Sequence, residues 1–370
     1  PQAIPRFWSI PAGVTMTVDS IRVVLGRLQD DPENEIAWEQ LAEIVTAPGT
    51  PEVELLRLLE QARARFERRR EWLGVARLLE MELSLSEGEE PAMQAELARI
   101  CDEELLDSGR ARAAYERLLE LDSGEQLKAR AKLFIQSDAE KRGKWTELVE
   151  RLASESESAQ DDALRAGLLL AAADVALRYG GSSADATKVA GYVETAITLD
   201  PKVERGAVHA ESALQNEPTR LVAVLKVILS GSGAKEDRVA AGIKAGRILA
   251  RRLSDRDGAV EVFQQVLDLS PGQTDSLSFL AEAYNETEQW DHLVALYEDQ
   301  LKGGVRGEAE QGITLQIGMV HWKRRGKPEA AEPHFDRLRK SDPTNGAVIS
   351  FFREYLREKG DNQKLATILG

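Results

Sequence analysis

The sequence has little of what marks secreted, membrane or metal-binding proteins. It has one cysteine, Cys101, so an intrachain disulfide is excluded, which suits a reducing compartment. No run of 18 or more apolar residues occurs, so no segment is expected to span a membrane. Residues 1–15 lack the basic start and the continuous apolar centre of a signal peptide. We therefore expect a cytoplasmic protein in which Cys101, set in an apolar stretch, is a buried side chain rather than a reactive thiol.

Histidine is scarce, and the motifs of catalysis are missing. No two of the four histidines are four residues apart, and none has a cysteine near it at ligand spacing. Neither a phosphate-binding glycine pattern nor the G-x-S-x-G pattern of serine hydrolases occurs. The many carboxylates are expected on solvated helix faces. The sequence therefore predicts a protein without a metal, a cofactor or an enzymatic activity.

The charge is strongly negative, with 63 acidic and 48 basic residues and a net charge of −15. A field of this sign repels phosphate backbones, which argues against a nucleic-acid partner. The strongest basic cluster is residues 63–70. It is either an anchor for an acidic partner, because guanidinium groups bind carboxylates, or an exposed helix end whose cations complement the helix dipole. The second interpretation is favoured.

Apolar residues recur every three or four positions from residue 17 onward, which is the period of an α-helix. Alternating runs of β-branched residues and Asn-Gly turns are missing, so no strands are expected. Breaks such as Asp200-Pro201 and Gly303-Gly304 follow every 12 to 20 residues, because glycine ends helices and proline blocks their extension. About twenty helices are expected.

Two sets of segments repeat along the chain. The first set consists of similar apolar segments at intervals of 72 or 73 residues, three of which begin with tryptophan. Its members begin at Trp72, Trp145, Pro218, Trp290 and Asn362. In the second set an apolar residue stands eight positions before the Pro or Ser that closes the helix. These residues are Tyr115, Val193, Phe263 and Phe335. We expect the second set to be buried against the neighbouring helix pair.

These segments resemble the tetratricopeptide repeat family over about residues 17–370. One matching second helix carries Ala259, Phe263, Val266 and Pro271, and the following first helix carries Leu277, Leu280, Ala281 and Tyr284. The same first-helix positions are matched by Trp38, Leu41, Ala42 and Val45. The resemblance implies an all-α, right-handed superhelical solenoid of antiparallel helix pairs, in which the 72–73-residue period is two repeats. A helix pair this short cannot bury its apolar stripe alone, so stacking is required. Small residues such as Gly246 and Gly318 let helices approach closely.

The resemblance also implies that the first helix of each pair lines a concave binding face. Its inward polar positions are expected to be Glu39, Glu43, Lys244, Arg251, Ser278, Glu282, Asn285, Gln316, Lys323, Ser350 and Glu354. Alternating acidic and basic strips would suit a partner segment of mixed charge. The carboxylate clamp of the family needs lysine and asparagine where this sequence has serine and glutamate, so capture of a chaperone's acidic tail is not expected. The alternative for the whole set is a solvated helix face.

The two ends suggest that the array, residues 16–370, is part of a longer chain. Repeat arrays normally finish with a polar-faced capping helix, whereas the last helix here, residues 363–370, stops about where Leu369 would expect a following partner. Residues 1–15 are expected to form an extended arm. Its Phe7 and Trp8 either dock into the groove of this molecule or of a neighbour, giving self-association, or belong to a leader or foreign segment.

The sequence thus predicts an interaction scaffold that binds a protein segment on the concave face of a helical solenoid. A second hypothesis is a non-catalytic repeat arm of a larger enzyme or signalling protein whose catalytic domain lies outside this chain. A third, a periplasmic or secreted assembly factor, would require a signal peptide before residue 1. The acidic, Ala-, Glu- and Arg-rich composition suggests a bacterial source.

Overall fold

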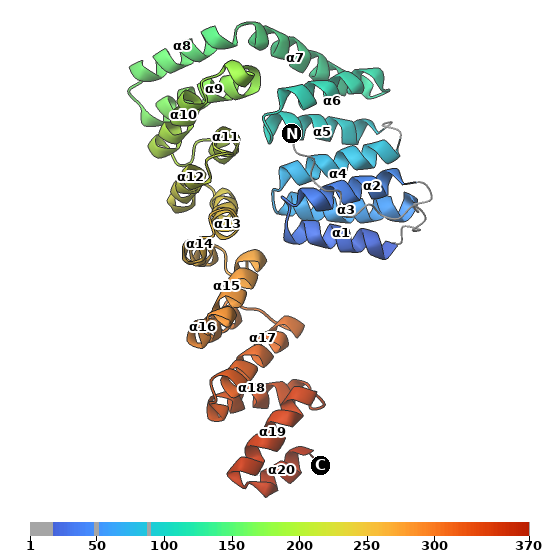
Figure 1. The fold of residues 1–370 in the computed structure, drawn as a ribbon, viewed down its shortest axis with the longest axis vertical. Helices are drawn as coiled ribbons and strands as arrows, with labels where there is room; N and C mark the ends of the chain where they lie inside the picture. Colours follow the sequence, from blue (N-terminus) through green and yellow to red (C-terminus); the bar gives the residue numbers. More distant parts are fainter. Residues whose placement is uncertain (1–17, 48–51, 87–89, 370) are drawn as a thin grey trace, which may run out of the picture. The chain divides into compact units, whose positions relative to one another are not determined.

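The structure is a computed structural model that describes residues 18–47, 52–86 and 90–369. These residues form twenty α-helices with one 3-10 and one π-helical turn, and they contain no strand (Figure 1). The expected all-α class and number of helices are confirmed. The chain divides into two compact units, residues 1–217 and 218–370. The arm with Phe7 and Trp8 and the end of the chain at Gly370 lie outside the described residues.

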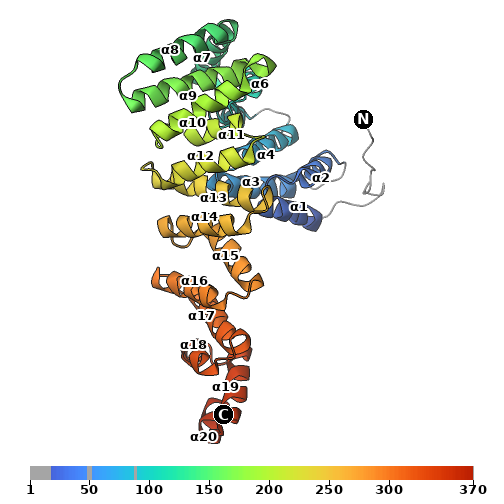
Figure 2. The same ribbon diagram turned by 60° about the vertical axis from the view of Figure 1, so that its left-hand side comes forward.

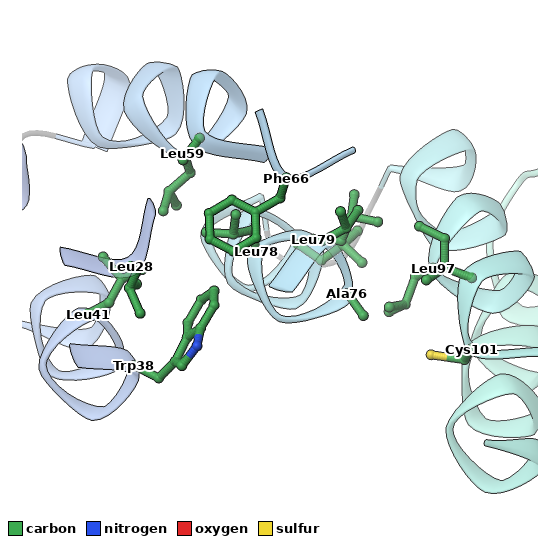
Figure 3. Close-up of a cluster of buried hydrophobic side chains, with 14 of the residues drawn as sticks. Leu28, Trp38, Leu41, Leu59, Phe66, Ala76, Leu78, Leu79, Leu97 and Cys101 are labelled. Atoms are coloured by element: carbon green, nitrogen blue, oxygen red, sulfur yellow. The ribbon is translucent and has the colours of Figure 1, made fainter. Parts of the chain in front are cut away.

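The first unit contains eleven of the described α-helices. They are α1 (Val18–Asp30), α2 (Glu35–Thr46), α3 (Glu52–Arg68), α4 (Trp72–Leu85), α5 (Pro91–Glu103), α6 (Ser108–Glu120), α7 (Gly124–Gly143), α8 (Trp145–Ser158), α9 (Asp162–Tyr179), α10 (Ala186–Leu199) and α11 (Gly206–Ala213), with the 3-10 turn η1 (Gly181–Ser183) after α9. Most helices pack against the next one along the chain, and α1 also contacts α3. The apolar side chains between α1 and α7 form one continuous core, part of which is drawn in Figure 3. Cys101 lies in this core with no exposed surface, as predicted.

The second unit continues the same pattern (Figure 2). Its helices are α12 (Pro218–Ser230), α13 (Lys235–Arg251), α14 (Arg256–Leu269), α15 (Thr274–Glu286), α16 (Trp290–Lys302), α17 (Glu308–Met319), α18 (Pro328–Ser341), α19 (Gly346–Lys359) and α20 (Asn362–Leu369), with the π-helical turn η2 (Val320–Arg324) extending α17. Every helix of this unit packs against its sequence neighbour. None of the described helices is long and apolar enough to cross a membrane.

The 72–73-residue spacing corresponds to four helices. The five segments that share it each begin a helix, namely α4, α8, α12, α16 and α20. Each tryptophan at these starts is half-buried against a later helix. Arg99 lies over the ring of Trp72, and Arg324 lies over the ring of Trp290. Trp145 lies beside Gly180, so a tryptophan at this place joins one group of four helices to the next.

The second repeated set occupies α6, α10, α14 and α18, and its four apolar residues are at most 2% exposed, as predicted. Two of them explain why glycine is needed on the neighbouring helix. A Cβ on Gly246 would lie 2.7 Å from the ring of Phe263, and one on Gly318 would lie 3.1 Å from the ring of Phe335. The two contacts are 72 residues apart, so the repeat preserves a specific close approach of helices.

The four-helix period makes α2 the counterpart of α6, and Trp38 on α2 is 4% exposed and is followed three residues later by buried Leu41. The structure therefore makes α2 the second helix of its pair, whereas the sequence match placed Trp38 on a first helix. The difference arises because α1 precedes α2 and contacts both α2 and α3.

The joint between α7 and α8 differs from the hairpins at α3–α4, α15–α16 and α19–α20. In those hairpins the residue two positions before the later helix is left-handed, with φ of 56° at Arg70, 55° at Glu288 and 73° at Gly360. The equivalent Gly143 stays helical, and Lys144 alone separates α7 from α8, so the two helices run on end to end (Figure 1). One residue is too short a loop to reverse the chain.

The sequence supplies a reason for this open joint. Where the α3–α4 hairpin buries Leu59 and Leu78, the equivalent positions on α7 and α8 are Lys132 and Arg151, which are exposed. Closing the hairpin would bury both charges, which costs several kcal/mol unless each finds a partner. The charges therefore favour the extended arrangement.

Candidate partner-binding surface

Most of the predicted binding residues lie on the first helices of the second unit. These helices are α13, α15, α17 with η2, and α19, and Figure 1 shows them on one side of the unit, with α12, α14, α16 and α18 on the other. The predicted residues on them are Lys244 and Arg251 on α13, Ser278, Glu282 and Asn285 on α15, Gln316 on α17, Lys323 on η2, and Ser350 and Glu354 on α19. All are exposed except Lys244, which is half-buried. The structure therefore places these polar side chains on one series of helices, most of them exposed.

Glu39 and Glu43 do not belong to this set. Both are exposed on α2, which is a second helix and lies in the first unit. Their assignment followed from the register at Trp38, and the presence of α1 changes that register.

The structure brings two of the predicted residues, Lys323 and Glu354, into direct contact. The Lys323 ammonium lies 3.2 Å from both carboxylate oxygens of Glu354. The same ammonium lies over the indole of Trp322, 3.4 Å from the ring centroid. The indole Nε1–H of Trp322 also donates to Glu354 at 3.2 Å. One carboxylate thus holds both a cation and the ring on which that cation rests.

Trp322 is itself fixed from below by the core of the second unit. Its ring meets the rings of Phe335 and Phe351 edge-on, at centroid distances of 5.8 and 5.4 Å. Phe335 and Phe351 are fully buried and stack on each other at 4.3 Å. Edge-on contacts of this kind are favourable for aromatic rings. The half-buried indole is therefore a rigid platform beside solvent.

The π-helical turn explains how this platform arises. Residues 320–324 of η2 carry Trp322 and Lys323, and a π turn shifts the side-chain register of a helix locally. Sequence analysis did not select Trp322. One feature of the sequence could have singled it out. Three other tryptophans begin helices of the 72–73-residue series, whereas Trp322 does not.

Helices of the second unit are also joined by ion pairs. Arg247 on α13 lies 3.4 Å from Asp275 on α15, and both side chains are mostly buried. Arg337 on α18 pairs with Glu310 on α17. Ion pairs therefore link α13 with α15 and α17 with α18.

The first unit holds a different polar cluster, which sequence analysis did not find. Arg178 on α9 pairs with Asp102 on α5 and, at 2.8 Å, with Asp174. The ring of His209 on α11 lies between Asp174, at 3.0 Å, and the backbone carbonyl of Arg205, at 2.8 Å. Burial would raise the pKa of Asp174, but the hydrogen bond from His209 and the charge of Arg178 outweigh it and lower that pKa to about 2.

This cluster joins helices α5, α9 and α11, which are up to 103 residues apart in sequence. Ser108 adds a hydrogen bond of 3.0 Å to the backbone carbonyl of Arg178. Because each charged group faces an opposite charge or a backbone carbonyl, the arrangement suits cohesion rather than proton transfer. Within the described part of the chain no group of three or more His, Cys, Asp or Glu side chains could hold a metal ion.

The basic cluster at residues 63–70 is largely used within the protein. Arg63 lies 3.0 Å from Glu82, which is 1% exposed, and Arg65 donates to Gln29 at 2.8 Å. Arg69 donates to the backbone carbonyl of Gln29 at 2.6 Å. Burial raises the pKa of Glu82, against the opposing effect of Arg63. These contacts tie α3 to α1 and α4.

The stacked helices define the class of the protein as an all-α helical-repeat protein. Residues 276–311, which span α15, α16 and the start of α17, match the family model described as tetratricopeptide repeat. This segment of the chain is therefore similar to a tetratricopeptide repeat. The matched residues include the helix that carries Ser278, Glu282 and Asn285. A comparison with curated proteins gives no match.

Several solved structures of helical-repeat proteins are similar to the chain at low identity. The TPR domain of P58(IPK) is 14% identical and aligns over 95% of this chain and 91% of its own, with a TM-score of 0.24. A monomeric mutant of IFIT1 with Gppp-AAAA is 14% identical over 96% and 87%, with a TM-score of 0.26. The structure of Naa15/Naa10 bound to HypK-THB gives 13% over 95% and 65%, with a TM-score of 0.24. At these TM-scores the likeness assigns no role to any residue.

Proposed function

We propose that the protein is an interaction scaffold that binds a protein segment along the first helices of its second unit. The observation that carries this proposal is the row of exposed polar residues on α13, α15, η2 and α19, on a frame held rigid by buried aromatic and ion-pair contacts. A rigid surface with fixed charges loses little conformational entropy on binding. Complementary charges then set the specificity and the rate of association.

The distribution of charge supports a partner of mixed charge. Residues 218–370 contain 22 basic and 22 acidic residues, so the whole excess of 15 negative charges lies in residues 1–217. The repulsion of phosphate inferred from the net charge therefore does not apply to the second unit. The support for a protein partner is instead the alternation of both signs along its first helices.

The test is affinity capture from the source cell with the full chain as bait. Glu282→Lys reverses a charge on the proposed surface, and Glu261→Lys reverses another exposed charge on α14, a second helix. We expect a set of captured proteins to be lost with Glu282→Lys and kept with Glu261→Lys. If both variants capture the same proteins as the unmodified chain, this surface is not the binding site. Loss of capture after nuclease treatment would instead indicate a nucleic-acid partner.

A further inference from the structure

The contact of Lys323 with Trp322 and Glu354 has the geometry of a cation-binding site. An ammonium group lies between an indole face, at 3.4 Å from the ring centroid, and two carboxylate oxygens, each at 3.2 Å. A cation is attracted by the negative face of an aromatic ring, and tryptophan is the strongest such ring in proteins. The carboxylate adds a charge-assisted hydrogen bond.

The cation is the weakly held member of this group, whereas the ring is fixed. The Lys323 side chain is 45% exposed, and its partner Glu354 is 50% exposed. An ion pair this open contributes little net stability, about 0–1 kcal/mol, because water competes with it. The indole is held by Phe335 and Phe351 and by its hydrogen bond to Glu354. Release of Lys323 would therefore leave the platform intact.

The other basic residues of this turn are engaged elsewhere. Arg324 lies over Trp290, at 5.5 Å from the ring centroid. Arg325 pairs with Asp291 and also contacts His321. Lys323 is thus the residue of η2 that is placed on Trp322.

We propose that Trp322 and Glu354 form a binding site for a lysine or arginine side chain of the partner, and that Lys323 occupies this site in the free protein. The proposal rests on the proposed function, because it names the chemistry of one contact on the same surface. The partner's cation replaces Lys323 on the indole face and pairs with the Glu354 carboxylate, to which it donates hydrogen bonds. Lys323 then acts as a competitor within the chain, which lowers affinity for weak cationic ligands and favours a partner that also binds elsewhere on the surface.

The site can be tested with a small probe, without knowing the partner. The indole N–H signals of the six tryptophans are recorded by ¹⁵N NMR of the full chain, and Trp322→Phe identifies the signal of Trp322. The protein is titrated with N-acetyl-lysine methylamide, and with N-acetyl-norleucine methylamide as the neutral analogue of similar shape. We expect the lysine probe to shift the Trp322 signal saturably in Lys323→Ala, with a dissociation constant roughly tenfold below that of the unmodified chain.

Two further variants keep the result specific. Glu354→Gln in the Lys323→Ala chain should abolish the shift, because the counter-ion is removed. Lys340→Ala removes a lysine that is 73% exposed on α18 and should behave like the unmodified chain. Circular dichroism confirms that each variant is folded.

The proposal is overturned if the lysine probe gives no saturable shift in Lys323→Ala, or if the norleucine probe shifts the signal equally. The outcome is separable from that of the capture experiment. Saturable binding of lysine, together with capture that Glu282→Lys leaves unchanged, would uphold the cation site and reject the proposed binding surface. Unchanged capture with Trp322→Phe, when Glu282→Lys loses it, would uphold the surface and show that the partner does not use the site.

Discussion

Replacing three glycines of the second unit by alanine should separate close packing from helix propensity. Gly246 and Gly318 stand 72 residues apart and face equivalent phenylalanines, whereas Gly312 on α17 is exposed and has nothing within 4 Å of an added Cβ. In a helix interior alanine is more favourable than glycine by about 1 kcal/mol. Gly312→Ala should therefore stabilise the unit by up to about this amount.

At the two packed glycines, Gly246 and Gly318, steric strain should offset the gain in helix propensity to different extents. An alanine at Gly246 would bring three ring atoms of Phe263 to within 2.7–2.9 Å of its Cβ. Phe263 is 2% exposed and lies 4.6 Å from the ring of Phe279, so it cannot move freely. Overpacking of this kind costs about 1–3 kcal/mol, which leaves Gly246→Ala destabilising by about 1 kcal/mol.

Gly318→Ala meets Phe335 at 3.1–3.3 Å, where a shift of a few tenths of an ångström suffices. Its net effect should be within about 0.5 kcal/mol of zero, since a small strain offsets the propensity gain. Urea unfolding of the full chain, followed by far-ultraviolet circular dichroism, gives the three free-energy changes. Because all three sites lie in one unit, they report on the same transition. If Gly318→Ala destabilises as much as Gly246→Ala, the argument from contact distance is wrong.

Three other predictions follow from single buried groups. The folded-state pKa of Asp174, about 2, lies below its unfolded value, so about 2 kcal/mol of stability should be present above about pH 4 and lost as the pH falls towards 2. The midpoint of urea unfolding, measured across this pH range, should fall with pH in the unmodified chain. In Asp174→Asn this part of the pH dependence should be absent. Ser276→Ala should leave stability unchanged or raise it by about 1 kcal/mol in the same unfolding assay, because the Ser276 hydroxyl is the one buried side-chain group among the described residues without a hydrogen-bond partner. Burial raises the pKa of Cys101 to about 11, so iodoacetamide at neutral pH should modify it in urea and not in the native protein, as measured by mass spectrometry.

The helical pattern could be predicted because the residues that end helices and fill the core are local in sequence. Proline and glycine mark the breaks, and the apolar residue eight positions before the closing Pro or Ser is buried in all four cases, from Tyr115 to Phe335. The register at Trp38 could not be predicted from the same information. Large apolar residues occur on both helices of a pair, and only the packing of α1 against α2 and α3 shows which helix is the second.

The contacts of the candidate surface depend on side-chain direction, which spacing alone does not give. Lys323 and Glu354 were both selected from the sequence, but their contact across 31 residues depends on the π turn, which redirects Trp322 and Lys323. The cluster around Arg178 joins residues 76 positions apart, and no local pattern in the sequence marks them as partners.

The open joint between α7 and α8 shows how a repeat can be kept in sequence and broken in structure. Trp145 keeps its place in the 72–73-residue series, yet Lys132 and Arg151 replace the leucines that a closed hairpin would bury. The apolar pattern records only the residues that favour packing, whereas a charge at the seam opposes it, because burying the charge unpaired costs more free energy than burying one leucine contributes. The first unit also holds α5, α9 and α11 together through Arg178, Asp174 and His209 rather than through apolar contacts alone. Cohesion in the first unit therefore comes from a few paired charged residues as well as from the repeated apolar positions.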